Sequence, residues 1–344
     1  MLGCPNRSLA SMRGCVWRKE APIVNYKSTV LLWLSILLAA CGGQPIPATP
    51  AGFSTPIPNR VEAHTDSGTD GHAHIHLDPS QATAAMQVVL VPSELVVGQN
   101  RFAVGLLDAA GHLILNAEVH FHYFDLTSPN APVLESEADA VRLQTPDGST
   151  TIFAQERNFD RAGTWGIEVL ARFPDGTAAI KRIQFQVLAD SSTVTPGQKA
   201  PAIHTSTAAD VNGDLSRLTS AAKPNPTFYK VSLAKAIASG KPTVLLFSTP
   251  AFCQSRLCGP AYDSVSDVQK IEDDAVNFVH VEVYTGLPNP ADNNWQVAPA
   301  MTAFGLTSEP WVFLIDGSGT VVYRVEGLVT ADEIERHVQV LLSK

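Results

Sequence analysis

The stretch Thr243-Val-Leu-Leu-Phe-Ser-Thr-Pro-Ala-Phe-Cys253 is followed, after four further residues, by Cys258-Gly-Pro260. It opens with an apolar run of strand length, which is typical of a strand buried on both faces. Pro260 fits the first turn of a helix, because a backbone N–H has no intrahelical partner there. The sequence therefore predicts a buried strand over 243–247 and a helix over 260–271, with two cysteines between them.

The flanking residues continue this alternation of strands and helices. Gly240 ends a short helix before the strand, and Thr330-Ala-Asp-Glu333 has the pattern of a capping box that opens a last helix. Asp316-Gly-Ser-Gly319 is typical of a hairpin turn. Besides the strand and helix above, the predicted elements are a helix over 233–238, a strand over 276–283, a helix over 299–304, strands over 311–315 and 321–325, and the last helix.

These features together resemble thioredoxin-like domains over residues 221–344. The resemblance implies an α/β thioredoxin fold and a catalytic redox role for Cys253 and Cys258. It also implies that Pro310, just before the strand at 311–315, is the family's cis-proline, whose loop faces the redox cysteines. The chain departs from the family in spacing, since thioredoxins have Cys-x-x-Cys and here Gln-Ser-Arg-Leu separates the two cysteines.

The longer spacing limits where the two cysteines can lie. On an α-helix, residues five apart have Cα atoms roughly 8.6 Å from each other, beyond disulfide reach, whereas residues three apart are roughly 5 Å from each other. We therefore expect Cys253 in the loop after the strand and Cys258 near the helix start, so that the loop folds back and closes a bridge. The helix N-terminus would lower the pKa of the nearer thiol, assisted by the charge of Arg256.

The sequence leaves the roles of the cysteines open. Either Cys253 takes the family's attacking position, after Phe252 where thioredoxins carry Trp, or Cys258 takes it and Ala261 replaces the usual second cysteine. Three hypotheses follow for the pair. The two cysteines exchange disulfides with other proteins, form a static disulfide that stabilises an exported domain, or bind a metal ion. Each of these three hypotheses is compatible with the spacing.

The metal hypothesis depends on a second resemblance. Sco-type copper chaperones are membrane-anchored thioredoxin folds with Cys-x-x-x-Cys and a distal histidine, and soft thiolates with imidazole suit copper. Here the spacing is one residue longer. His280, in a predicted buried strand, and His337, on the last helix, are the only histidines between 221 and 344. We expect His280 to be a hydrogen-bonded core residue.

The N-terminal segment carries a targeting signal. Lys27 precedes the apolar run 30–40, which is too short to span a bilayer but fits a signal peptide. Leu38-Ala39-Ala40-Cys41 resembles the lipobox of bacterial lipoproteins. The resemblance implies a lipoprotein signal peptide over 1–40, a lipid on Cys41, and an extracytoplasmic protein anchored to the bacterial membrane by that lipid.

Residues 41–85 read as a flexible tether that contains a histidine tract. The segment is rich in Pro, Thr, Gly and Asp and has no apolar periodicity. An extended backbone would place His72, His74 and His76 on one face, about 6.6 Å apart, where they would share one copper or zinc ion. The alternative is that these histidines are part of a solvated tether.

Residues 86–188 alternate between apolar and polar side chains in short runs separated by turns such as Pro146-Asp-Gly148. This pattern predicts about seven antiparallel strands in an all-β sandwich. The stretch 159–166 resembles immunoglobulin-like domains of bacterial envelope proteins of the FixH/YtkA type. His120 and His122 share the polar face of one strand, and residues 189–220 are predicted to be a linker.

Charge and composition exclude one class of function. The 344 residues carry a net charge of −9, and removal of the first 40 leaves 19 basic and 32 acidic residues, or −13. Such an acidic body is repelled by phosphate, which argues against nucleic-acid binding. The leading hypothesis is a membrane-anchored thiol–disulfide oxidoreductase that acts on thiols and disulfides of envelope proteins and requires no cofactor. The alternatives are a copper-binding or copper-delivery protein and a non-catalytic envelope scaffold.

Overall fold

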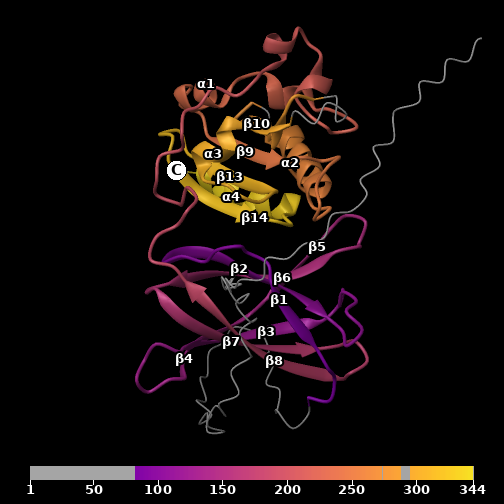
Figure 1. Ribbon diagram of the computed structural model, residues 1–344, viewed down its shortest axis with the longest axis vertical. Helices are drawn as coiled ribbons and strands as arrows, with labels where there is room; N and C mark the ends of the chain where they lie inside the picture. The colour runs from indigo at the N-terminus through magenta and orange to yellow at the C-terminus, as the bar shows by residue number, and fades with distance from the viewer. Residues whose placement is uncertain (1–81, 273, 288–294, 344) are drawn as a thin grey trace, which may run out of the picture. The chain divides into compact units, whose positions relative to one another are not determined.

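The computed structural model describes residues 82–272, 274–287 and 295–343. An all-β part comes first in the chain and an α/β part follows it (Figure 1). An all-β sandwich followed by an α/β part is the order that the sequence predicts, and the structure confirms it. None of the helices in these ranges has the length and apolar character that crossing a bilayer requires.

The all-β part consists of two four-stranded antiparallel sheets. One sheet has the order β1 (Gln87–Leu90), β2 (Gly98–Leu107), β6 (Thr151–Phe159) and β5 (Val141–Gln144). The other has the order β4 (Val133–Asp139), β3 (Glu118–Asp125), β7 (Gly163–Arg172) and β8 (Ala178–Val187). Eight strands in this part of the chain are one more than the alternation predicts.

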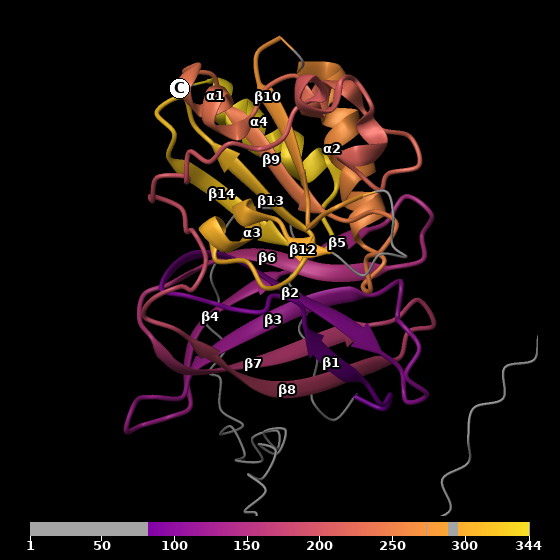
Figure 2. The ribbon, with the colours of Figure 1, turned by 45° about the horizontal axis from the view of Figure 1, so that its top comes forward.

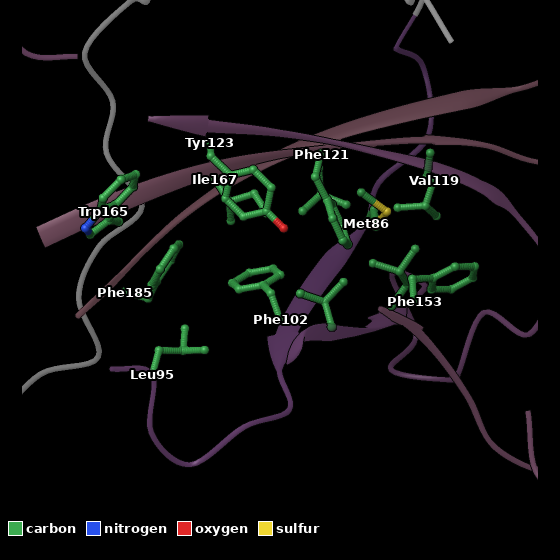
Figure 3. Close-up of a cluster of buried hydrophobic side chains, with 14 of the residues drawn as sticks. Met86, Leu95, Phe102, Val119, Phe121, Tyr123, Phe153, Trp165, Ile167 and Phe185 are labelled. Carbon is green, nitrogen blue, oxygen red and sulfur yellow. The ribbon is translucent and has the colours of Figure 1, made fainter. Parts of the chain in front are cut away.

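Aromatic side chains from both sheets fill the sandwich core. The Phe102 ring lies edge-on to Phe121 and Tyr123, at centroid distances of 5.5 and 5.3 Å, and Figure 3 shows it pointing toward both. All three side chains are fully buried. Because side chains alternate across a strand, the residues next to Phe121 and Tyr123 on β3 are directed to the opposite face of the sheet.

The α/β part is built on a four-stranded sheet with the order β10-β9-β13-β14. Strand β9 (Thr243–Ser248) pairs in parallel with β10 (Asn277–Glu282) and antiparallel with β13 (Trp311–Ile315). Strand β14 (Val321–Glu326) completes the hairpin with β13. All residues of β9 and β13 are buried, which explains why both read as continuous apolar runs.

Helices cover both faces of this sheet (Figure 2). The buried core on one face includes side chains from α1 (Leu233–Ala238) and α3 (Pro299–Phe304). On the other face, α2 (Cys258–Glu272) and α4 (Ala331–Leu342) pack with the short helix η4 (Pro226–Tyr229). The last helix begins where the sequence predicts it, with the Thr330 side chain accepting a hydrogen bond from the Glu333 amide.

The segment between β8 and η4 packs against the α/β part. The amides of Val194 and Gly197 donate to the carbonyls of Phe304 and Val321. Ala200 is buried in the core on the α1 and α3 face. These contacts are made by a Ser-, Thr- and Pro-rich segment, and the sequence carries no periodic signal for them.

The sandwich and the α/β part belong to one compact unit and share a buried ion pair. Arg101 Nε lies 2.7 Å from Glu333 Oε1, and the two side chains are 4% and 6% exposed. Arg101 also donates to the Leu328 carbonyl at 2.7 Å. The Leu328 side chain packs in an apolar cluster with sandwich residues such as Leu143 and Ile152. A charge buried in this way needs its partner, because an unpaired buried charge is strongly destabilising.

Candidate redox site

Cys253 and Cys258 lie in the turn after β9 and at the start of α2, as their spacing predicts. Cys253 is in the turn after β9, and Cys258 is the first residue of α2. The two residues form a disulfide with their Cα atoms 5.9 Å apart, within the range that a bridge can span. The helix start therefore holds one sulfur, and the preceding loop brings the other back to it.

A tight reversal of the four intervening residues closes this loop. The Arg256 amide donates to the Cys253 carbonyl at 3.4 Å. Arg256 itself has a φ of 61°, in the left-handed region that costs a residue other than glycine about 1–2 kcal/mol. Ser255 Oγ accepts from the Leu257 amide at 3.4 Å and lies 3.2 Å from Cys253 Sγ. This reversal accommodates the two residues by which the loop exceeds Cys-x-x-Cys.

The two cysteines differ in their exposure to solvent. Cys258 is fully buried at the base of α2, whereas Cys253 is partly exposed. A cavity of about 430 Å³ adjoins both segments, since Ala251 precedes Cys253 by two residues and Gly259 directly follows Cys258, and both line it. Of the two cysteines, Cys253 is the one that solvent reaches.

The sheet register places Pro310 beside the cysteines. Phe247, near the end of β9, pairs with Trp311, the first residue of β13. The loop that leaves β9 and the loop that enters β13 consequently lie at the same end of the sheet. The Glu309–Pro310 peptide bond is cis, and Pro310 is buried. The Pro310 carbonyl accepts a hydrogen bond from the Gly327 amide at 2.9 Å, which fixes this loop to the end of β14.

Glu309 is a site residue that the sequence reasoning missed. A carboxylate oxygen of Glu309 and the sulfurs of Cys253 and Cys258 all lie within 4.8 Å of one another. Burial raises the pKa of the Glu309 carboxyl. The signal that would have found it is its position directly before Pro310, in the loop that the resemblance places opposite the cysteines.

Neither histidine of this domain joins the cysteines as a metal ligand. Among the described residues, the group that could hold a metal at the sulfurs is completed by Glu309. His280 is 2% exposed and is the hydrogen-bonded core residue that the sequence predicts. Its Nδ1 lies 2.7 Å from Tyr229 Oη, and its Nε2 lies 2.9 Å from Ser248 Oγ. His337 stacks on Tyr323, with ring centroids 3.6 Å apart.

Four of the predicted site residues fall outside the described ranges. These are the lipidation site Cys41 and the proposed metal ligands His72, His74 and His76. Their roles stay predictions from the sequence.

Comparisons with known proteins agree with the fold of the C-terminal part. Residues 229–341 match the family model of the thioredoxin-like domain. This part of the chain is therefore a thioredoxin-like domain, and a β-sandwich precedes it. No curated protein matches the chain.

Several solved structures are similar at low identity. A thiol:disulfide interchange protein of the thioredoxin family from Chlorobium tepidum TLS is 24% identical, and the match covers 45% of this chain and 99% of that one at a TM-score of 0.30. The PmoD soluble domain of Methylocystis sp. ATCC 49242 is 15% identical, with 31% and 93% covered and a TM-score of 0.22. CopC of Methylosinus trichosporium OB3b is 14% identical, with 30% and 97% covered and a TM-score of 0.21.

The buried His280 makes the stability of the protein sensitive to acid. Burial lowers its pKa from 6.5 to about 3, so the folded state keeps the ring neutral while the unfolded state binds a proton below pH 6.5. The free energy of unfolding should therefore fall as the pH falls from 6.5 toward 3, by up to about 1.4 kcal/mol per pH unit from this group. Between pH 6.5 and pH 3, the free energy of unfolding measured with urea should fall less steeply for His280→Gln than for the wild type. Parallel curves for the wild type and this variant would contradict the assignment.

Proposed function

We propose that this protein is a thiol–disulfide oxidoreductase in which Cys253 and Cys258 alternate between a dithiol and a disulfide. The observation that carries the proposal is a disulfide at the start of α2, beside the loop at Pro310, with one partly exposed and one buried cysteine. A static bridge would not need this asymmetry, because both of its sulfurs can be buried equally well. The thioredoxin-like domain supports the same reaction class.

The reaction proceeds by two exchanges of sulfur bonds. In the oxidising direction for the protein, the Cys253 thiolate attacks a partner disulfide, forms a mixed disulfide and releases one partner thiolate. The Cys258 sulfur, as a thiolate, then attacks Cys253 Sγ, closes the internal bridge and releases the second partner thiolate. Two electrons pass to the partner, and the two protons lost from the dithiol balance the two partner thiols formed.

The surrounding residues supply orientation and proton handling. The loop at Pro310 presents the backbone against which a partner segment aligns next to Cys253. The N-terminus of α2 stabilises negative charge on sulfur, since its amides lack intrahelical acceptors. Glu309, raised in pKa by burial, is placed to exchange a proton with the sulfurs as each thiolate forms or is consumed.

The proposal places this chemistry outside the cytoplasm, on a protein anchored to the bacterial membrane through a lipid on Cys41. The lipobox-like residues Leu38-Ala39-Ala40-Cys41 support it. The partners would be thiols and disulfides of envelope proteins. Copper delivery by the dithiol is less well supported, because the residue that joins the sulfurs is a carboxylate rather than the histidine that the Sco-type resemblance implies.

The anchor can be tested with a single substitution. Cys41→Ser should abolish lipidation and release the protein from membranes, measured by fractionation and by mass spectrometry of the mature chain. Cys4→Ser and Cys15→Ser, both within the segment predicted to be removed, are matched controls and should leave the protein on the membrane. A membrane-bound Cys41→Ser protein would refute the anchor.

The dithiol proposal predicts a reversible redox equilibrium. Against glutathione buffers, the bridge should have a potential above about −300 mV, the value below which inert structural disulfides lie. Cys258→Ser should accumulate a mixed disulfide through the accessible Cys253, whereas Cys253→Ser, which leaves the buried sulfur, should form little. A bridge that stays oxidised at about −300 mV would refute the exchange reaction. Stoichiometric Cu(I) binding to a reduced pair that does not exchange would favour copper delivery instead.

The position of Glu309 predicts a change in the pH profile of Cys253. An ionised carboxylate near the sulfurs disfavours a neighbouring thiolate. In the Cys258→Ser background, Glu309→Gln should therefore shift the pH midpoint of Cys253 alkylation downward by about one unit. Asp332→Asn, on the exposed surface of α4, is the matched control. An unchanged midpoint in Glu309→Gln would show that Glu309 does not act on the sulfurs.

A further inference from the structure

A second cluster of ligand side chains lies in the sandwich, in elements that the redox site does not use. His120 and His122 are on β3, and they alternate with the core residues Phe121 and Tyr123. Both imidazoles therefore lie on the face of the sheet turned away from the sandwich core. The two rings are 5.1 Å apart, in an edge-on arrangement.

The sheet register surrounds these rings with carboxylates. Strand β3 pairs with β4 on one side, which sets His120 opposite Asp139 and His122 opposite Glu137. It pairs with β7 on the other side, which sets His122 opposite Glu168. Directly opposed side chains on neighbouring strands are within contact distance, so this register is what assembles the cluster.

Each ring has one nitrogen bound to a carboxylate of its own. His120 Nδ1 lies 2.6 Å from Asp139 Oδ1, and His122 Nδ1 lies 3.1 Å from Glu168 Oε1. Arg182 Nε donates to the second oxygen of Glu168 at 2.6 Å and holds that carboxylate in place. In the tautomer whose Nδ1–H donates to this carboxylate, Nε2 carries the lone pair with which an imidazole binds a metal ion.

The Nε2 atoms of the two histidines face the same carboxylate, that of Glu137. Oε2 of Glu137 lies 4.0 Å from Nε2 of His120 and 3.5 Å from Nε2 of His122. One ligand atom from each of these three residues lies within 4.8 Å of the other two. A tetrahedral ion with bonds of about 2.0–2.1 Å needs its ligand atoms about 3.3–3.4 Å apart. Closing the three atoms to that spacing takes side-chain rotations of Glu137, which is exposed, and of His122, which is partly exposed.

We propose that His120 Nε2, His122 Nε2 and the Glu137 carboxylate bind a divalent transition-metal ion, Cu²⁺ or Zn²⁺. Imidazole and carboxylate together suit these ions, and the outer carboxylates orient the two histidines as in known metal sites. When both rings are neutral, the three carboxylates that contact them contribute three negative charges and Arg182 contributes one positive charge. The local charge is then about −2, which a dication neutralises.

The site is open to solvent on one side. His120 is almost fully buried, whereas the Glu137 and Asp139 side chains are each 45% exposed. Three protein ligands with an exposed fourth position are typical of sites where the ion meets a water molecule or another ligand. This proposal does not depend on the dithiol, because it uses neither cysteine.

The test uses the full chain with its disulfide oxidised, so that thiolates do not compete for the ion. A background variant, His72→Ala/His74→Ala/His76→Ala, removes the histidine tract. Calorimetric titration of this background with Cu²⁺, and separately with Zn²⁺, should show one bound equivalent of at least one of the two ions. Absence of micromolar binding of both ions would overturn the proposal.

Substitutions introduced into this background variant show which residues bind the ion. Glu137→Gln and His122→Gln should each lose it, while Glu168→Gln should keep the stoichiometry and weaken affinity about 10–100-fold. His112→Gln, whose side chain is 81% exposed, is the matched control and should bind as the background does. Equal binding by Glu137→Gln, His122→Gln and the background would overturn the proposal.

A spectroscopic readout separates loss of a ligand from loss of the fold. Where Cu²⁺ binds, its electron paramagnetic resonance spectrum should show coupling to two imidazole nitrogens in the background and in Glu168→Gln. Near-ultraviolet circular dichroism of the buried Trp165 should be unchanged in Glu137→Gln. If Glu137→Gln keeps this signal and still binds the ion with full affinity, Glu137 is not a ligand and the proposal fails.

Discussion

The reach of a disulfide is the constraint on which the redox site depends. Two cysteines five residues apart cannot bond within one regular helix, so the chain between β9 and α2 must fold back on itself. The Cα atoms of Cys253 and Cys258 are 5.9 Å apart because Arg256 adopts a left-handed backbone in that reversal. The same reversal places Cys258 at the buried helix start and leaves Cys253 at the surface.

The sheet supplies the other half of the site. Strand β9 is central and pairs antiparallel with β13, so the end of one strand meets the beginning of the other. Glu309 and Pro310, which precede β13, are thereby held beside a loop more than fifty residues earlier in the chain. A site of this kind needs both the local reversal and the long-range pairing, and neither alone would bring a carboxylate to the sulfurs.

The difference between a local reversal of the chain and a long-range strand pairing explains which features could be predicted from the sequence. Apolar runs, capping residues and cysteine spacing are local signals, and they gave β9, α2, the hairpin of β13 and β14, and the position of Cys258 at the helix start. Glu137 could not be found in this way, because its role depends on which residue of β4 faces which residue of β3. Glu309 lies in the loop before β13, and the signal for it is its place beside the proline that the resemblance sets opposite the cysteines. A shift of the register by one residue would move each side chain to the other face of its sheet.

The two proposed sites differ in the chemistry that their donor atoms favour. Sulfur beside a half-buried carboxylate suits electron and proton exchange, and without an imidazole it is a poor match to the Cys₂His set of a copper chaperone. Two imidazoles and a carboxylate, oriented by Asp139 and Glu168, are borderline and hard donors that favour a divalent ion over Cu(I). The two proposals therefore separate thiol chemistry from metal binding and place each on a different sheet.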